Sequence, residues 1–324
     1  MNKLIIGALL MTIFFNSLSD NIIPPKNLDY VSFPKSEKKS KGMKVIKAKE
    51  DIKSISLENV VYTIKDNTPL HLNILYPSFE PSEKNKEKYP LIIYIQGSAW
   101  RKQNLGMGVG QLSRMAEKGY IIAIVEYRSS DIAIFPAQIK DTKTAIRYML
   151  KNSEKYGVDK DKVVVCGDSS GGHTAAMVGA TLNEKEYNDE DSQLDIKAII
   201  DFYGPTDISK MNFEPSIQDH ISPSSPEGEL IGKVNVLENL EKVYPTVVMN
   251  HISKEKYLPP FLIIHGNKDR LVPFGQSVLL YDKLKEENKI VEFYQLDGAD
   301  HGGAPFWQED ILDIVDKFIK ENLK

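Results

Sequence analysis

The sequence predicts an α/β fold in which a mostly parallel, doubly wound sheet carries helices on both faces. Two observations support this prediction. Short continuous apolar runs recur along the chain, as is typical of parallel strands covered on both faces. Stretches with helical periodicity separate these runs, and such alternation indicates a doubly wound sheet. A length of 324 residues is sufficient for one large domain of this class.

The expected elements follow one another along the chain. Residues 60–64 and 70–76 flank a turn-forming sequence and predict an antiparallel hairpin. Six further strands are expected at 91–95, 121–125, 163–166, 198–202, 261–264 and 291–294. Helices are expected at 110–118, 137–156, 172–182, 276–287 and 309–323. In the second helix the apolar residues that repeat at helical spacing should face the sheet: Ile139, Ala145, Ile146 and Met149.

One interval, residues 211–256, breaks the alternation of strands and helices. It contains Pro215, Pro223, Pro226, Gly228 and Gly232, with a single short helical patch at 237–243. It lies between two core strands, where a small lid over an active site can be inserted. A surface excursion without catalytic bearing is the alternative interpretation.

The N-terminal residues resemble an export signal. Lys3 provides a positive charge, residues 4–15 are apolar, and residues 17–19 offer small side chains for cleavage. We expect a signal peptide at 1–19, a flexible polar leader at 20–57 and a catalytic domain at 58–324. The protein is therefore expected to be secreted or periplasmic, with no stable membrane span after cleavage. An uncleaved anchor is the alternative.

Composition excludes several classes of function. The net charge is −4 and no basic patch interleaves with aromatic residues, so no nucleic-acid partner is expected. The single cysteine, Cys166, rules out an intrachain disulfide and favours a buried core residue. The histidines lack metal-ligand spacing, and the glycines at 106–110 lack the rest of a dinucleotide fingerprint. No metal or cofactor is expected, and the oligomeric state is not predicted.

The most specific motif lies at residues 163–173. An apolar, β-branched run leads into Gly167-x-Ser169-x-Gly171, and a helix-compatible segment follows. A strand, a sharp turn and a helix form the context that a nucleophile elbow requires. Because a serine hydroxyl is a weak nucleophile, its proton must be removed by a base that a third group orients. Ser169 is thus the candidate nucleophile.

Candidates for the base and the acid follow in the order that this architecture uses. Asp269 lies in a loop directly after an apolar strand, and His301 lies in a glycine-rich loop after the last strand. Such loops, at the carboxyl ends of strands, are where an open α/β sheet binds its ligands. Asp297 and Asp300 are fallback acids, although both lie close to His301 in sequence.

An acyl-transfer site also needs donors for the tetrahedral oxyanion. The backbone N–H of Ser170, directly after the nucleophile, is expected to supply one. The second donor is expected from the loop after strand 91–95, in the region of Gly97 and Ser98, where small residues let the main chain approach the substrate.

Seven segments resemble bacterial α/β-hydrolase esterases, nearest to the feruloyl-esterase-like branch related to hormone-sensitive lipase. They are residues 94–100, 135–141, 156–159, 167–173, 224–227, 265–273 and 298–303. The resemblance implies an α/β-hydrolase fold with Ser169, Asp269 and His301 as the triad and 96–100 as the oxyanion loop. Trp100 and His173 match positions that wall the substrate pocket, although core packing explains them nearly as well. The family begins this loop with His-Gly-Gly, where this chain has Gln96-Gly97-Ser98.

The function expected from these residues is that of an exported serine carboxylic ester hydrolase. His301 removes the proton of Ser169, which attacks the ester carbonyl, and water then releases the acyl group. The expected substrate is a small ester or an acylated carbohydrate, with acetyl or hydroxycinnamoyl groups of plant polysaccharide implied by the resemblance. Two alternatives remain: an amidase or peptidase on the same triad, and a non-catalytic binding module.

Overall fold

The computed structural model describes residues 26–29, 31–47, 55–77, 88–190, 193–254 and 257–323. The expected signal peptide at 1–19 lies outside the described residues. Residues 26–29 and 31–47 are exposed and form no helix or strand. They belong to a unit separate from the folded domain. The domain itself starts with a strand at Ile55, three residues before the boundary expected at residue 58.

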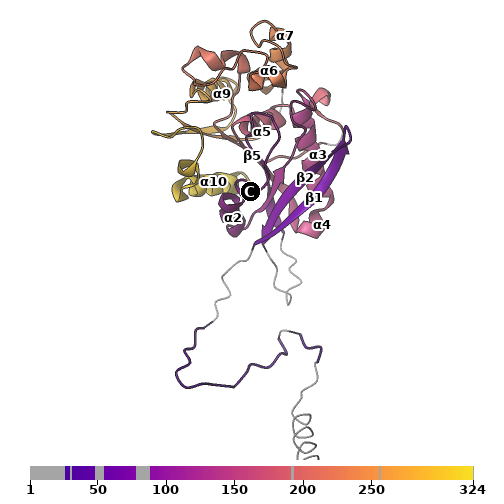
Figure 1. The fold of residues 1–324 in the computed structure, drawn as a ribbon, viewed down its shortest axis with the longest axis vertical. Helices are drawn as coiled ribbons and strands as arrows, with labels where there is room; N and C mark the ends of the chain where they lie inside the picture. Colours follow the sequence, from indigo (N-terminus) through magenta and orange to yellow (C-terminus); the bar gives the residue numbers. More distant parts are fainter. Residues whose placement is uncertain are drawn as a thin grey trace, which may run out of the picture. The chain divides into compact units, whose positions relative to one another are not determined.

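The domain is built on one eight-stranded sheet (Figure 1). Its strands lie in the order β1 (Ile55–Lys65), β2 (Thr68–Pro77), β4 (Ile121–Val125), β3 (Tyr89–Ile95), β5 (Val158–Asp168), β6 (Ala198–Phe202), β7 (Phe261–Gly266) and β8 (Val291–Leu296). The β1–β2 hairpin is antiparallel, β2 pairs antiparallel with β4, and all remaining pairs are parallel. The predicted strands and the mostly parallel sheet are confirmed.

Helices cover both faces of this sheet. The larger helices are α2 (Val109–Glu117), α3 (Ala137–Lys151), α5 (Ser170–Ala180), α9 (Gly275–Glu286) and α10 (Glu309–Asn322). Because side chains alternate along a strand, β3 sends Leu91, Ile93 and Ile95 into the core shared with α3, α5 and α9. The intervening Ile92 and Tyr94 pack in the core shared with α2 and α10. Strands buried on both faces explain the continuous apolar runs of the sequence.

The helix expected at 137–156 is two helices. α3 ends at Lys151 and α4 (Ser153–Tyr156) follows, because Asn152 leaves helical geometry with φ −99° and ψ 21°. The four residues expected to face the sheet from α3 are indeed fully buried. Among the helices that the structure describes, none combines the length and hydrophobicity needed to cross a bilayer.

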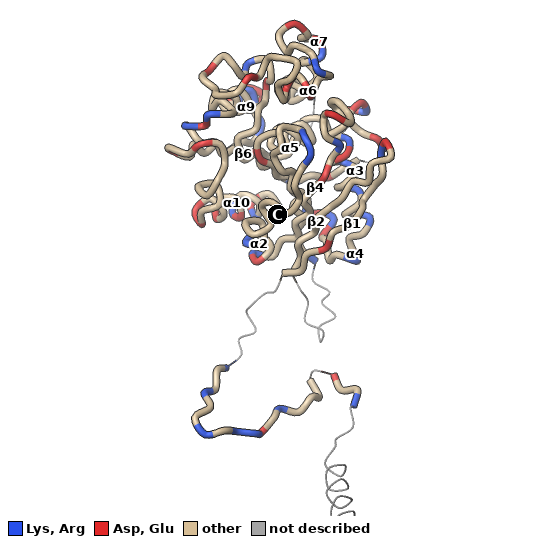
Figure 2. The backbone as a smooth tube through the Cα atoms, in the orientation of Figure 1, with Lys and Arg blue, Asp and Glu red and all other residues tan. Residues whose placement is uncertain are grey.

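The side of the domain formed by α2 and α10 carries charges of both signs, shown side by side in Figure 2. Arg114 of α2 pairs with Glu309 at the start of α10, and the Lys118 ammonium lies 2.7 Å from the Asp313 carboxylate. Exposed pairs of this kind add little stability. The apolar residues that both helices bury therefore account for most of their attachment to the sheet.

The interval 211–256, called the inserted segment below, connects β6 to β7. With the residues just before it, it forms η2 (Ile208–Phe213), α6 (Pro226–Leu230), α7 (Leu240–Val243), η3 (Tyr244–Thr246) and α8 (Met249–Ile252). The sequence predicted only the patch at 237–243. Pro226 lies in the first turn of α6. A proline is tolerated there because the N–H that it lacks would have no acceptor within the helix. The Ser225 hydroxyl caps that helix by accepting from the Gly228 N–H.

Candidate active site

Ser169 lies at the junction of β5 and α5 in a strained backbone conformation. Its φ is 53° and its ψ is −126°, a region that residues with a Cβ rarely occupy. Only glycine fits on either side. A Cβ on Gly167 would lie 2.2 Å from the Gly171 carbonyl oxygen, and one on Gly171 would lie 1.9 Å from that of Ile95. The motif therefore builds the sharp turn that exposes the Ser169 hydroxyl.

His301 reaches this hydroxyl from the loop after β8. Its Nε2 lies 2.9 Å from Ser169 Oγ, and its Nδ1 lies 2.7 Å from Asp269 Oδ2. Because a carboxylate only accepts hydrogen bonds, Nδ1 carries the hydrogen and Nε2 is free to accept the serine proton. The structure thus brings together the three residues that the sequence nominated as nucleophile, base and acid.

Asp269 accepts four hydrogen bonds. Two come from the backbone N–H groups of Leu271 and Val272, at 2.8 and 2.9 Å, and the third comes from His301. The fourth comes from His265 Nε2 at 3.1 Å. Burial alone would raise the pKa of Asp269, but the bonds from the two imidazoles lower it to about 2. The carboxylate therefore remains charged and holds His301 in one orientation.

The fallback acids bind elsewhere. Asp300 forms an ion pair with Arg270 and accepts the backbone N–H of His301, whereas Asp297 accepts from the Asn267 side chain. Neither carboxylate contacts the His301 ring. Asp269 is therefore the candidate acid that orients the His301 ring, and neither Asp297 nor Asp300 is in a position to replace it.

The oxyanion loop differs in detail from the expectation. The Gly97 N–H donates to the Asp168 carboxylate at 3.0 Å, and the Ser98 N–H donates to Ser170 Oγ at 2.9 Å. Both amides named as candidates for the second donor are therefore occupied, which corrects that prediction. The N–H of Ala99 donates to no acceptor among the described residues, and Ala99 lines the pocket around Ser169. Ala99 replaces Gly97 and Ser98 as the candidate.

Ser170 remains the candidate for the first oxyanion donor. It is the first residue of α5, so its N–H has no acceptor within the helix. It also lies at the positive end of the helix dipole, which favours a developing negative charge. Its side chain, by accepting from the Ser98 N–H, joins the elbow to the oxyanion loop.

Asp168 is a site residue that the sequence reasoning missed. Its half-buried carboxylate accepts from the Tyr94 hydroxyl at 2.7 Å and from the Gly97 N–H, so it fixes the oxyanion loop against the elbow. Burial raises the pKa of Asp168 above its ordinary value, against the lowering effect of these hydrogen bonds. The sequence signal that could have indicated this role is that Asp168 directly precedes the nucleophile Ser169.

The pocket at Ser169 has a volume of 360 Å³. Its walls come from the oxyanion loop, the elbow, the His301 loop and the inserted segment, which contributes Gln218, His220, Pro226 and Glu227. The sequence analysis predicted that a lid could be inserted in this interval, but it assigned none of these four residues to the site. A helix start is indicated by the sequence Ser225-Pro226-Glu227. No local pattern, however, predicts that this helix faces Ser169.

Trp100 and His173 have different positions relative to this pocket. Trp100 lines it, whereas His173 is fully buried and is absent from its lining. The Trp100 Nε1–H donates to His173 Nδ1 at 3.2 Å, and His173 Nε2 donates to the Thr246 carbonyl at 2.9 Å. His173 is therefore a packing residue behind the pocket wall, which corrects the tentative assignment of that residue to the pocket.

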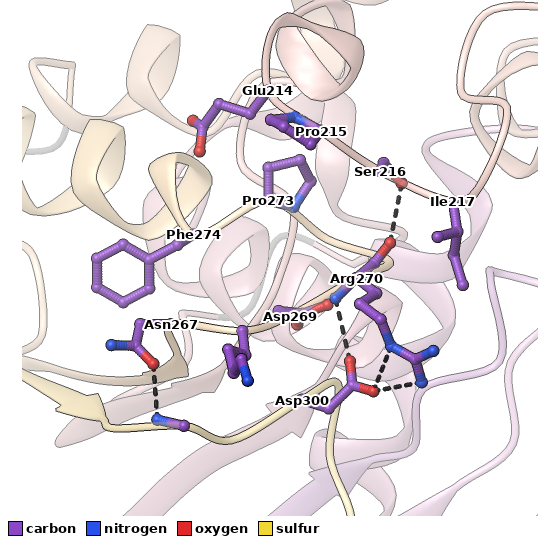
Figure 3. Close-up of a pocket in the computed structure, with 12 residues that line it drawn as sticks. Glu214, Pro215, Ser216, Ile217, Asn267, Asp269, Arg270, Pro273, Phe274 and Asp300 are labelled. Carbon is purple, nitrogen blue, oxygen red and sulfur yellow. Dashed lines mark hydrogen bonds and ion pairs between the residues drawn. The ribbon is translucent and has the colours of Figure 1, made fainter.

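A second hollow of 640 Å³ lies along the loop that carries Asp269 (Figure 3). Glu214, Ser216 and Ile217 line one side of it, and the Arg270–Asp300 ion pair lies on another. It is larger than the pocket at Ser169, but neither Ser169 nor His301 lines it. The chemistry therefore belongs to the smaller pocket. In the part of the chain that the structure describes, no group of three or more His, Cys, Asp or Glu could hold a metal ion.

Comparison with known proteins identifies the family. The family model described as BD-FAE matches residues 78–284, which is more than half of the chain. The chain belongs to the BD-FAE family. This assignment agrees with the resemblance of the sequence to feruloyl-esterase-like α/β-hydrolases.

Named relatives and solved structures extend this finding. Esterase LipC of Mycobacterium tuberculosis is 29% identical over 222 residues, which are 66% of this chain and 53% of LipC. A structure described as a truncated carbohydrate esterase from gut microbiota is 29% identical, with a TM-score of 0.71 over 85% of this chain and 98% of that one. The butyrate-bound Est2 esterase of Thermogutta terrifontis is 25% identical, with a TM-score of 0.64 over 82% and 94%. The domain has the α/β-hydrolase fold, and the chain spans about half the length of the curated relatives it matches.

Proposed function

We propose that this chain is a serine carboxylic ester hydrolase that works through an acyl-enzyme on Ser169. The observation that carries the proposal is the continuous hydrogen-bonded path from Ser169 Oγ through both ring nitrogens of His301 to Asp269. In this arrangement one imidazole takes the serine proton and later gives it to the leaving alcohol. The esterase names of its relatives support the same reaction class.

The reaction proceeds in two halves. Ser169 Oγ attacks the ester carbonyl while its proton passes to His301 Nε2, and the resulting oxyanion receives hydrogen bonds from the Ser170 and Ala99 N–H groups. One such donor contributes about 2.7–4 kcal/mol to transition-state stabilisation. The imidazolium then protonates the leaving alcohol. Water, deprotonated by the same imidazole, attacks the acyl-enzyme and releases the acid.

The proposed substrates are small esters or acylated carbohydrates, including acetyl or hydroxycinnamoyl groups on plant polysaccharide. The pocket volume of 360 Å³ lies near the lower end of the range for small-molecule sites, which favours short acyl groups. A similar structure is described as a carbohydrate esterase, which supports the polyhydroxylated class of alcohol.

We further propose export of the protein to the periplasm or the medium. The charge of Lys3, the apolar run at 4–15 and the small residues at 17–19 support a cleaved signal. N-terminal sequencing of protein recovered outside the cytoplasm should show loss of about the first 19 residues. Recovery of the intact N-terminus would contradict this proposal.

The proposed reaction is tested with nitrophenyl acetate and butyrate, acetylated xylan, methyl ferulate and a nitroanilide amide. We expect hydrolysis of one or more esters, with little turnover of the amide. Ser169→Ala should lower kcat by about 10⁶-fold, whereas Ser113→Ala, on the surface of α2, should leave it unchanged. A preference for the nitroanilide would favour an amidase. Binding without turnover of any substrate would favour a recognition module.

A further inference from the structure

A second imidazole contacts the carboxylate that orients His301. His265 lies near the end of β7, and its side chain is fully buried. Its Nε2 lies 3.1 Å from Asp269 Oδ2, the same oxygen that His301 Nδ1 approaches at 2.7 Å. This carboxylate oxygen therefore lies between two imidazole rings, and the proposed reaction gives a role to only one of them.

The hydrogen bonds of His265 define its protonation state. Nε2 lies 3.1 Å from each of two acceptors, Asp269 Oδ2 and the Val272 carbonyl oxygen, so Nε2 carries a hydrogen. Nδ1 lies 2.7 Å from Ser277 Oγ. Among the described residues the Ser277 hydroxyl has no other acceptor for its hydrogen, so it donates to Nδ1, which is then unprotonated. His265 is thus a neutral imidazole whose one N–H points at the acid.

These contacts fasten the loop that carries Asp269. His265 belongs to β7 before the loop, and Ser277 belongs to the first turn of α9 after it. Val272, on the returning part of the loop, accepts from His265 and donates its N–H to Asp269 Oδ1 at 2.9 Å. A buried imidazole is unfavourable unless its nitrogens are hydrogen-bonded. Here both are bonded, and one bond goes to the acid of the proposed triad, which an apolar core residue could not supply.

We propose that His265 is a positioning residue that holds Asp269 Oδ2 in place and takes up part of its negative charge. This inference rests on the proposed esterase function. His265 does not line the pocket at Ser169, so it acts on the reaction only through the carboxylate. The hydrogen-bonded path from Ser169 then extends beyond Asp269 to Ser277.

The donor on His265 governs how strongly Asp269 attracts the imidazolium of His301. A hydrogen bond to a carboxylate stabilises its charge. Burial raises the pKa of Asp269, and the bond from His265 contributes most to lowering it to about 2. Without this bond the negative charge would be left to His301 alone. The imidazolium would then persist to a higher pH, and the carboxylate that orients it would be less firmly fixed.

The other ionisable groups near the two rings are the same in every variant compared. The Tyr203 ring centroid lies 4.8 Å from that of His301 and 6.3 Å from that of His265. Burial raises the pKa of Tyr203 well above its ordinary value, so its hydroxyl stays neutral. Asp168 and Asp300 accept hydrogen bonds from other groups and none from His265. A change in the pH dependence therefore reports on the bond that His265 donates.

The test compares His265→Leu with His265→Gln. Leucine has a comparable volume and no donor, whereas the glutamine amide can donate from near the position of Nε2. His71→Gln is the control for loss of a histidine, because the His71 ring bonds to Glu126, outside the site. Two quantities are measured between about pH 5 and pH 8. They are kcat/KM for nitrophenyl acetate and the rate constant of labelling by a fluorophosphonate, which needs an activated serine but no ester.

His265→Leu should move the acidic limb of both pH profiles upward by about half a pH unit and lower kcat by about tenfold. His265→Gln should return the limb close to its wild-type position and recover most of kcat, and His71→Gln should match the wild type. The position of the limb does not depend on how much enzyme is folded, so a purely structural role would lower the rates without moving it. An unmoved limb in a folded His265→Leu, checked by thermal unfolding, would overturn the proposal.

A measurement on the wild type tests the proposal even if His265→Leu does not fold. The ¹⁵N chemical shifts of the histidine rings distinguish the two neutral tautomers from the imidazolium. His265 should be neutral at pH 7 with its hydrogen on Nε2, and a hydrogen on Nδ1 would overturn the proposal. If no ester were hydrolysed while the fluorophosphonate still labelled Ser169, the esterase proposal would fail, and the labelling profile would still decide the role of His265.

Discussion

Asp269 shows how a single carboxylate is made into an orienting group. Four donors surround it, and two of them are backbone N–H groups of its own loop. The loop thereby fixes the position of the carboxylate before it contacts His301. A carboxylate with a pKa of about 2 has no protons to exchange at neutral pH, so the role we propose for it is to hold and stabilise the imidazolium.

Asp269→Asn tests this role. The amide can present its N–H₂ to His301 and favour the wrong tautomer, so kcat on a nitrophenyl ester should fall by about 10⁴-fold. Asp297→Asn, which removes a carboxylate that accepts a hydrogen bond from the Asn267 side chain, should stay within about twofold of the wild type. If Asp269→Asn kept more than a tenth of the wild-type kcat, a different acid would have to orient His301.

The substitution Gly97→Ala tests the position of the oxyanion loop. A Cβ at this residue would lie 2.7 Å from the Asp168 carbonyl oxygen and 2.7 Å from the Ser169 Cβ, so the loop must move. Displacing an oxyanion donor should lower kcat by about 10²-fold or more, with a smaller change in KM. Gly110→Ala, which meets nothing within 4 Å, is the matched control and should be fully active. Wild-type kcat in Gly97→Ala would show that the loop does not bind the oxyanion.

At the level of elements, one buried hydrogen-bond chain joins three parts of the site. Trp100 extends from the oxyanion loop to His173 of α5, and His173 extends to Thr246 of η3 in the inserted segment. The chain requires a neutral imidazole, because Nδ1 must accept from the Trp100 indole. Burial lowers the pKa of His173 from its ordinary value of 6.5 to about 4, which keeps the ring neutral.

This burial predicts an acid-sensitive contribution to stability. Between pH 6.5 and about 4 the unfolded chain binds a proton at residue 173 that the folded protein does not bind. The free energy of unfolding should therefore fall as the pH decreases through this window. Denaturant unfolding of the wild type and His173→Asn should show a stability difference that narrows from pH 7 to pH 4.5. A difference that stays constant over that range would mean that His173 titrates normally in the folded protein.

For the molecule as a whole, the features that the sequence predicted are those with local or periodic signals. Apolar runs marked the strands of the sheet, and Gly167-x-Ser169-x-Gly171 marked the elbow because only glycines tolerate its close contacts. Asp269 and His301 could be chosen because the order of strands assigns their loops to one edge of the sheet. These inferences require only the order of the elements along the chain. They do not require knowledge of which side chains touch in the folded protein.

The features that escaped prediction depend on contacts between distant segments. The Gly97 N–H donates to the carboxylate of Asp168, which lies 71 residues away in sequence. No local sequence pattern predicts which amide of a loop remains without an acceptor. His173 lies behind Trp100 because the inserted segment closes over it. Likewise, nothing near Glu227 in sequence shows that one of its buried oxygens receives no hydrogen bond from any described residue.

The central claim is that His301 and Asp269 activate the hydroxyl of Ser169. A fluorophosphonate probe measures this directly, because it forms a covalent bond only with an activated serine. Intact mass spectrometry should show one phosphonyl group per chain, peptide mapping should locate it on Ser169, and His301→Ala should slow the labelling by several orders of magnitude. Labelling at another residue, or labelling of His301→Ala at the wild-type rate, would contradict the account.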